Sequence, residues 1–162
     1  MYTMKPLIIG DSAVSNELRS LQTAAYLVEA RLIGFDGIPQ INETHEALLT
    51  SNATFYGCRL DGRLAGAIAL EQESTGELTI DRLVVHPDFF RKGIGQFLLR
   101  QTLALHPNVD WLVSTGALNT PAIKLYLSMG FTETGRKEVA PGLELASFRR
   151  PSSPLTDTII RS

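Results

Sequence analysis

The segment from Leu78 to Leu99 constrains the fold of this chain most strongly. Its first half ends in the apolar run Leu83-Val84-Val85 and predicts a β-strand, and its last residues predict the start of an amphipathic helix. A basic turn that contains Gly93 and Gly95 separates the two. Such a turn lets the backbone approach an anion closely, and the first turn of a helix offers unpaired N–H groups and the positive end of its dipole. We therefore expect a pyrophosphate-binding element here.

The size and charge of the chain limit its class. Its 162 residues suit one domain, and a hydrophobic content of 44% with 20% charged residues predicts a packed core. The formal net charge is −2, and the basic clusters are only pairs, such as Arg91-Lys92 and Arg149-Arg150, which disfavours nucleic acid as a partner. The single cysteine, Cys58, excludes an intramolecular disulfide and fits a reducing compartment.

Apolar segments of membrane-spanning length and metal-ligand spacings are both missing from the sequence. No stretch approaches the roughly 20 apolar residues of a membrane helix, and the N-terminus lacks the apolar run of a signal peptide. The three histidines and Cys58 have no metal-ligand spacing. We therefore expect a cytoplasmic protein with no membrane partner and no metal.

Hydrophobic periodicity and turn residues predict an α/β domain over residues 1–150 and a tail over 151–162. We expect strands at 6–9, 54–60, 63–71, 77–85, 109–115, 131–138 and 143–150. We expect helices from Asp11 or Ser12 to Gly34, at 42–49, at 94–105, and from Asn119 or Thr120 to Gly130. For the helix at 42–49, Asn42 or Thr44 is the expected cap. Asp61-Gly62 predicts a hairpin. A helical crossover between strands 77–85 and 109–115 predicts that they are parallel.

Two blocks of sequence carry a family resemblance. The first, LVVHPDFFRKGIG, runs from Leu83 to Gly95, and the second, NTPAIKLYLSMGF, runs from Asn119 to Phe131. They resemble the two signatures of the GCN5-related N-acetyltransferases (the GNAT family), and the order of elements over about residues 5–150 fits as well. The resemblance implies a GNAT fold, which is a mixed central sheet of about seven strands, splayed at its centre, with about four helices. It also implies that acetyl-CoA binds in the cleft as co-substrate.

The glycine turn departs from the family pattern at its first position. Relatives usually carry Gln or Arg where this chain has Phe90, and the arginine stands one place later, at Arg91. A pyrophosphate site made of backbone N–H groups is still possible after this change, because it does not depend on a particular side chain. The cofactor-binding residues that we predict for the turn are Phe90, Arg91, Lys92, Gly93, Ile94, Gly95 and Gln96. For the side chains of Arg91 and Lys92, contact with a phosphate and simple solvation both remain open.

The resemblance gives the strand end Leu83-Val84-Val85 two further tasks. In relatives, a backbone N–H of this segment faces the oxyanion that forms when an amine attacks the thioester, and this lowers the barrier. The backbone groups also pair with the pantetheine amides like an added strand. We expect Leu83, Val84 and Val85 to bind the cofactor and to belong to the buried sheet.

The leaving thiolate needs a proton, which a phenol can supply. Tyr126 lies seven residues after Asn119, which is two helical turns, so both side chains point from one helix face. The resemblance implies that Asn119 contacts the pantetheine arm or a bound water and that Tyr126 is the acid. The alternative for Tyr126 is a core aromatic that packs on Phe131.

A lysine-type amine must lose a proton before it attacks. Asp81 is the first candidate for the base, and Glu77, Glu71, Glu73 and water are its rivals. Alternation along the strand predicts one face with Thr79, Asp81, Leu83 and Val85, and another with Ile80, Arg82, Val84 and His86.

Several of these candidates have a second interpretation. An ion pair with Arg82 or Arg63 is the alternative for Asp81. Tyr26 and Glu29 in the first helix could instead shape the amine site, and core packing is the alternative for Tyr26.

The resemblance, together with these residues, implies an acetyl-CoA-dependent N-acetyltransferase, which is an acyltransferase for groups other than aminoacyl groups. We expect it to move acetyl directly from the CoA thioester to a primary amine. No sequence motif identifies the acceptor, which is a small-molecule amine or a peptide amine. The terminal strands offer a pairing surface for a homodimer. The alternative is a domain of the same fold that binds acyl-CoA as a sensor or scaffold without transfer. The presence of Asn119 and Tyr126 favours the enzyme, because a pure binder needs no acid beside the thiol.

Overall fold

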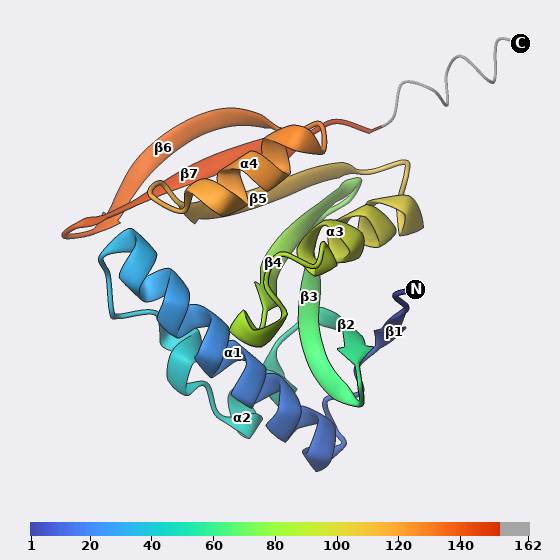
Figure 1. The fold of residues 1–162 in the computed structure, drawn as a ribbon. Coiled ribbons are helices and arrows are strands. Elements are labelled where there is room, and N and C mark those ends of the chain that lie inside the picture. Colours follow the sequence, from blue (N-terminus) through green and yellow to red (C-terminus); the bar gives the residue numbers. More distant parts are fainter. Residues whose placement is uncertain (153–162) are drawn as a thin grey trace, which may run out of the picture.

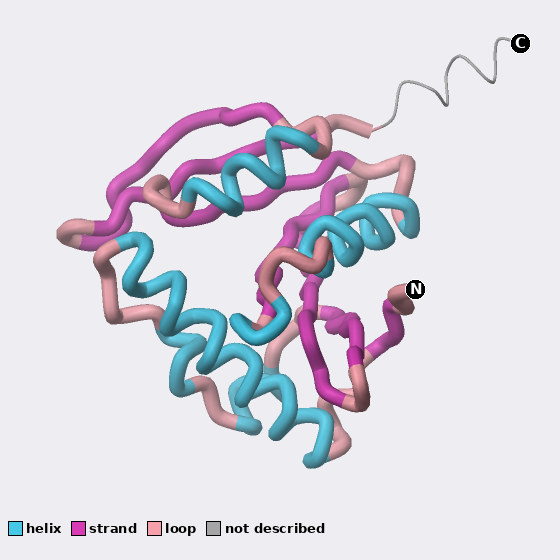
Figure 2. The backbone as a smooth tube through the Cα atoms, in the orientation of Figure 1, coloured by secondary structure: helices cyan, strands magenta, loops and turns pink. Residues whose placement is uncertain are grey.

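The computed structural model describes residues 1–152 and contains one seven-stranded sheet with helices on both faces (Figures 1 and 2). The strands are β1 (Met4–Pro6), β2 (Thr54–Leu60), β3 (Arg63–Ser74), β4 (Glu77–Val85), β5 (Asp110–Gly116), β6 (Thr132–Ala140) and β7 (Leu143–Arg150). The helices are α1 (Ser12–Ile33), α2 (His45–Thr50), α3 (Ile94–Leu105) and α4 (Thr120–Ser128), with short 3-10 helices η1 (Pro39–Asn42) and η2 (Pro87–Phe89). The predicted seven strands and four helices are confirmed, while residues 153–162 of the predicted tail lie outside the described residues.

The helix ends follow from capping residues. Asp11 precedes α1, and its carboxylate accepts hydrogen bonds from the N–H groups of Ala13 and Val14. Gly34 ends the same helix in the left-handed conformation, with φ 68°. Thr44 caps α2, which starts later than expected because the preceding residues form η1. No helix within residues 1–152 is long and apolar enough to cross a membrane.

The opening strand lies nearer the N-terminus than predicted. We expected it at 6–9, but β1 spans Met4–Pro6 and pairs with Tyr56 to Cys58 of β2. The chain must turn before α1 begins, and the N–H of Asp11 donates to the carbonyl of Ile8 at 3.1 Å. The last residues of the predicted strand therefore lie in this turn and not in β1.

The sheet opens between its two central strands. Its order is β1-β2-β3-β4-β5-β7-β6, and neighbours are antiparallel except β4 and β5, which are parallel as predicted. β4 and β5 pair only from Glu77 to Ile80, although β4 continues to Val85. Beyond Ile80 the two strands diverge (Figure 1). The edge of β4 that faces β5 is therefore left without a strand partner along its last five residues.

A β-bulge at Asp81 overturns the predicted faces of β4. Ala69 of β3 pairs with Arg82, whereas the next residue of β3 pairs with Ile80, so Asp81 is the extra residue. Ile80 consequently lies in the core on the α3 side, and Val84 lies in the core on the α1 side. The two were predicted to share a face, and this is wrong because the bulge shifts the alternation by one residue.

Two apolar cores cover the two faces of the sheet. The larger core joins α3 and α4 to the sheet and contains fully buried Trp111, Phe131 and Phe148. The smaller core joins α1 and α2 to β2, β3 and β4 around Leu18 and Leu21. Because α1 covers one face and α4 the other, the opening between β4 and β5 is bordered by both helices.

Candidate active site

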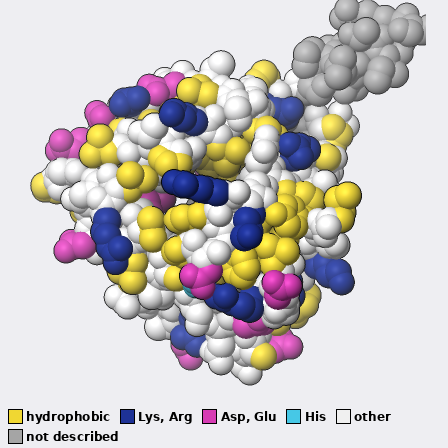
Figure 3. Space-filling view, viewed as in Figure 1, with side chains coloured by type: hydrophobic (Ala, Val, Ile, Leu, Met, Phe, Trp, Pro, Cys, Tyr) yellow, Lys and Arg dark blue, Asp and Glu magenta, His cyan; other side chains and the backbone are white. Residues whose placement is uncertain are grey.

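A cavity of about 450 Å³ lies where α1, the end of β4, the start of α3 and α4 meet. Its lining residues are Ala25, Tyr26, Val28, Glu29, Leu32, Leu83, Val84, Val85, Phe90, Arg91, Gly95, Asn119, Pro121, Ala122, Leu125 and Tyr126. Figure 3 shows hydrophobic side chains gathered over the middle of this face of the molecule, with Lys and Arg side chains among them. The two signature blocks of the sequence therefore line one cavity.

The turn before α3 has the geometry of an anion cradle. Arg91 and Gly93 both adopt positive φ, at 63° and 75°, and Gly93 precedes the helix without a side-chain cap. The first N–H groups of α3 thus keep their hydrogen-bonding capacity. Asp11, Thr44 and Asn119, in contrast, cap α1, α2 and α4 through their side chains.

Only part of the predicted phosphate turn lines the cavity. Phe90, which is 45% exposed, Arg91 and Gly95 lie in its wall, whereas Lys92, Gly93, Ile94 and Gln96 do not. The hydroxyl of Tyr2 donates to the carbonyl of Lys92 at 2.5 Å and so braces the turn from the N-terminal side. No local pattern predicts this contact, because Tyr2 lies far from the turn in the chain.

The end of β4 forms the floor of the cavity. Leu83, Val84 and Val85 all line it, and their backbone pairs with β3 on one side only. The other edge faces the opening toward β5. An extended ligand with amide groups can therefore add to this edge in the manner of a strand.

Asn119 and Tyr126 lie in one wall of the cavity, as their spacing predicts. Asn119 caps α4, because its Oδ1 accepts from the N–H of Ala122 at 3.3 Å, and its Nδ2 donates to Oε1 of Glu29 at 2.8 Å. Tyr126 is 4% exposed and packs edge-on against Phe131, with ring centroids 5.5 Å apart. Tyr126 thus both packs in the core and lines the cavity.

Burial controls the ionisation of the groups around Tyr126. Desolvation raises the pKa of the Tyr126 phenol, and the nearby Glu29 raises that pKa further, so the hydroxyl stays protonated at neutral pH. Tyr26 across the cavity behaves in the same way, since burial raises its pKa too. Within residues 1–152 the Tyr126 hydroxyl makes no hydrogen bond to the protein, so it is free to donate to a ligand.

The structure does not bring Asp81 into the cavity. Its carboxylate accepts from Nε of Arg82 at 2.7 Å, which is the ion pair weighed above as its alternative. Glu77 likewise pairs with Arg149, at 3.0 Å, and Glu71 and Glu73 are not lining residues. Glu29 is the only carboxylate among the described residues that line the cavity.

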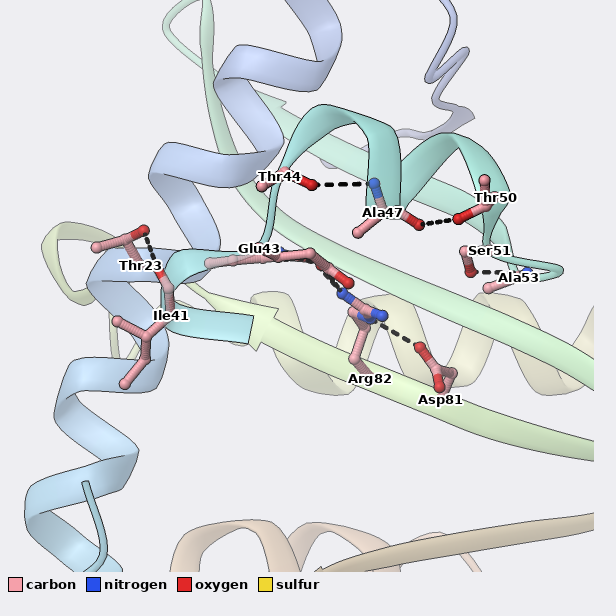
Figure 4. A network of polar contacts seen from close by, with 11 residues as sticks. Thr23, Ile41, Glu43, Thr44, Ala47, Thr50, Ser51, Ala53, Asp81 and Arg82 are labelled. Atoms are coloured by element: carbon pink, nitrogen blue, oxygen red, sulfur yellow. Dashed lines mark hydrogen bonds and ion pairs between the residues drawn. The ribbon is translucent and has the colours of Figure 1, made fainter. Parts of the chain in front are cut away.

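Arg82 is the centre of a buried polar network, of which the sequence indicated only the pair with Asp81 (Figure 4). It donates to Glu43 at 2.6 Å, to Gln22 at 2.9 Å and to Asp81, and its guanidinium lies 5.3 Å from the ring centroid of Phe55. The network ties α1 and the segment after η1 to β4. One signal for it was available, since the polar Gln22 interrupts the apolar stripe of α1.

Comparisons with known proteins agree with this geometry. The Acetyltransferase (GNAT) domain family matches residues 51–133. The [Ribosomal protein bS18]-alanine N-acetyltransferase of Salmonella typhimurium is 34% identical over 107 residues, which are 58% of this chain and 72% of that protein. The UPF0157 protein YqkA of Bacillus subtilis is 40% identical over 139 residues, or 85% of this chain, and the chain spans 40% of the length of that relative.

Solved structures show the same fold at low identity. The ribosomal-protein-S18-alanine N-acetyltransferase of Escherichia coli superposes with a TM-score of 0.74 at 18% identity, covering 94% of this chain and 95% of that one. The PaiA N-acetyltransferase of Thermoplasma acidophilum, solved in complex with coenzyme A, gives a TM-score of 0.71 at 17% identity, covering 93% and 99%. From the family match, the relatives and the fold together, the chain belongs to the GNAT acetyltransferase family.

Proposed function

We propose that this protein is an acetyl-CoA-dependent N-acetyltransferase that moves an acetyl group directly from the CoA thioester to a primary amine. The observation that carries the proposal is one shared cavity. It joins the unpaired edge of β4, the side of the uncapped α3 turn and the Tyr126 side chain. Acetyl transfer from CoA needs these three parts. The strand edge binds the pantetheine arm of the donor, the turn binds its pyrophosphate, and Tyr126 protonates the leaving thiolate.

The residues present fit acetyl-CoA. The turn from Arg91 to Gln96 offers backbone N–H groups at the start of α3 to the pyrophosphate, and Phe90 adds an exposed ring at the mouth of the cavity. Leu83 to Val85 and Asn119 line the cavity, where the strand edge would pair with the pantetheine amides of bound CoA and Asn119 would support that arm from α4. Acetyl-CoA, when bound, supplies the activated acetyl group, and the chain supplies orientation and proton transfer.

The overall reaction converts the ammonium form of the acceptor and acetyl-CoA into an amide, free CoA thiol and one proton released to solvent. The amine nitrogen attacks the carbonyl carbon of the thioester, a C–N bond forms, and a backbone N–H at the end of β4 stabilises the oxyanion. The C–S bond then breaks, the thiolate takes a proton from the Tyr126 hydroxyl, and the nitrogen loses a proton that restores Tyr126 through solvent. A second proton, which the ammonium carries at neutral pH, must leave before the attack.

Names of relatives bear on the acceptor. One is named for an alanine of a ribosomal protein, and a second, from Salmonella typhimurium and 40% identical over 65 residues, is named a peptidyl-lysine N-acetyltransferase. We extend to this chain only what those names share, which is a primary amine as acceptor.

Thiol release from acetyl-CoA across a panel of amines tests the proposal. The panel should hold alkylamines, an arylamine, free amino acids, and peptides with a free N-terminus or a lysine. We expect amine-dependent release of one thiol per acetylated product. If CoA binds tightly but no amine raises thiol release above the rate in buffer, the protein is a sensor or scaffold and the proposal is wrong.

A further inference from the structure

Glu29 of α1 is a half-buried carboxylate that has no cationic partner among residues 1–152. Its hydrogen bond comes from the neutral amide of Asn119 at 2.8 Å. Of the other five half-buried carboxylates among the described residues, Glu17, Glu43, Glu77 and Asp110 are each paired with an arginine, and Glu71 does not line the cavity. Burying an uncompensated negative charge costs free energy, so an unpaired carboxylate in a cavity wall is a place where a cation would be stabilised.

The contacts of Asn119 determine its orientation and that of Glu29. The Oδ1 atom of Asn119 is committed to the N–H of Ala122, so its NH₂ group must face Glu29. This bond uses Oε1 of Glu29 and leaves Oε2 without a hydrogen bond to any described residue. Because Glu29 also lines the cavity, the carboxylate keeps one oxygen for a ligand.

The charged and titratable groups around Glu29 come from three elements. Tyr26 is one turn away on the same helix, Tyr126 faces it from α4, and burial raises the pKa of both phenols so that both stay neutral. Arg91 is the only cation among the described residues that line the cavity, and it belongs to the turn before α3. Nothing else charged in the described cavity wall competes with a ligand for Glu29.

The walls beside Glu29 are apolar. Ala25, Val28 and Leu32 of α1 lie on its own side of the cavity, and Leu83 lies on the β4 side. None of these side chains can pair with a carboxylate. An acceptor with a negative charge next to its amine would meet the Glu29 carboxylate, and the only cation in the described cavity wall, Arg91, belongs to the turn that we assign to the pyrophosphate.

We propose that Glu29 binds the ammonium group of the acceptor and takes its proton, and that the acceptor carries this amine on an apolar, carboxylate-free scaffold. The assignment rests on the acetyltransferase function proposed above. One N–H bond of the ammonium breaks, its proton passes to a carboxylate oxygen of Glu29, and the lone pair that remains on nitrogen attacks the thioester. The proton then leaves Glu29 for solvent, so the carboxylate is regenerated in each turnover.

Desolvation supports this role. Burial raises the pKa of the Glu29 carboxyl, and the hydrogen bond from Asn119 limits the rise. A carboxylate of raised pKa is a stronger proton acceptor.

The first arm of the test measures binding without acetyl transfer. Calorimetry follows benzylamine, an apolar amine that is protonated at pH 7, as it binds the protein with CoA present. Glu29→Gln keeps the shape of the side chain and should weaken binding at least tenfold, whereas the matched change Glu46→Gln, on the exposed face of α2, should leave it unchanged. Equal binding by wild type and Glu29→Gln, or no binding by wild type, overturns the proposal.

The second arm separates proton transfer from a structural role. With benzylamine, Glu29→Gln should lower kcat/KM by roughly 10²-fold, and with aniline, which is already neutral at pH 7, the loss should nearly vanish. Phenylalaninamide should be acetylated far better than phenylalanine, which differs from it by a free carboxylate. An equal loss for benzylamine and aniline contradicts the proposal. Absence of thiol release with every amine instead contradicts the proposed function, and the binding arm still reports on Glu29.

Discussion

Asn119 donates a hydrogen bond from Nδ2 to Oε1 of Glu29 at 2.8 Å and thereby joins α4 to α1 across the opening of the sheet. The two residues are 90 positions apart in the chain and belong to helices on opposite faces. The same Asn119 side chain caps α4. The side-chain amide of Asn119 therefore caps the helix that carries Tyr126 and also orients Glu29, the carboxylate that we propose binds the acceptor amine.

The two bonds of Asn119 can be separated by substitution. Asn119→Ser retains a capping oxygen but is too short to reach Glu29, whereas Asn119→Ala loses both contacts. Urea unfolding should show Asn119→Ala to be less stable than Asn119→Ser by about 1 kcal/mol, which is the usual value of a side-chain cap. If the two variants have the same free energy of unfolding, the cap contributes nothing and the assigned orientation of the amide is wrong.

Glu29→Gln should stabilise the protein at alkaline pH. The folded pKa of Glu29 is raised above its value in the unfolded chain, so folding carries no penalty below the unfolded pKa and an increasing one as pH rises through the folded pKa. Glutamine never ionises and avoids that penalty. Thermal unfolding should give Glu29→Gln a higher Tm than wild type at pH 8 and the same Tm at pH 4. A higher Tm of wild type at pH 8 would mean that the Glu29 carboxylate has a stabilising partner in the fold.

Local sequence predicted the parts of this structure that depend on local chemistry. Asp61-Gly62 predicted the β2–β3 hairpin, and both residues adopt the positive φ that such a turn requires. The bulge at Asp81 is missed when strict alternation is assumed along the whole strand, whereas the adjacent polar residues Asp81 and Arg82 break that alternation. The contact between Glu29 and Asn119 left no signal, since it depends on how two distant helices meet.

Gly93→Asp should weaken CoA binding. An aspartate at this position sets a negative charge at the start of α3, where we place the pyrophosphate, and strains a residue with φ 75°. Gly62→Asp is the matched control, because Gly62 has φ 76° and lies in the β2–β3 hairpin outside the cavity. Calorimetry should show lost affinity for Gly93→Asp alone. Undiminished affinity in that variant would place the pyrophosphate elsewhere.

Arg82→Ala should be among the most destabilising changes in the chain. Arg82 is 8% exposed, and its removal leaves Glu43 and Asp81 without their countercharge and Gln22 without a donor. Breaking a buried pair in this way costs about 3–5 kcal/mol. Arg59→Ala removes an exposed pair with Glu17 and should cost about 0–1 kcal/mol. Similar unfolding midpoints for the two variants would show that the network around Arg82 contributes little.

The central claim is that Tyr126 protonates the thiol in an acetyl-transfer cavity, and the turnover number of Tyr126→Phe tests it most directly. Thiol release is measured with a good acceptor for wild type, Tyr126→Phe and Tyr56→Phe, the last being a tyrosine of β2 outside the cavity. We predict that Tyr126→Phe lowers kcat by roughly 10²-fold with little change in CoA affinity, and that Tyr56→Phe matches wild type. A Tyr126→Phe variant that turns over as fast as wild type would contradict the account.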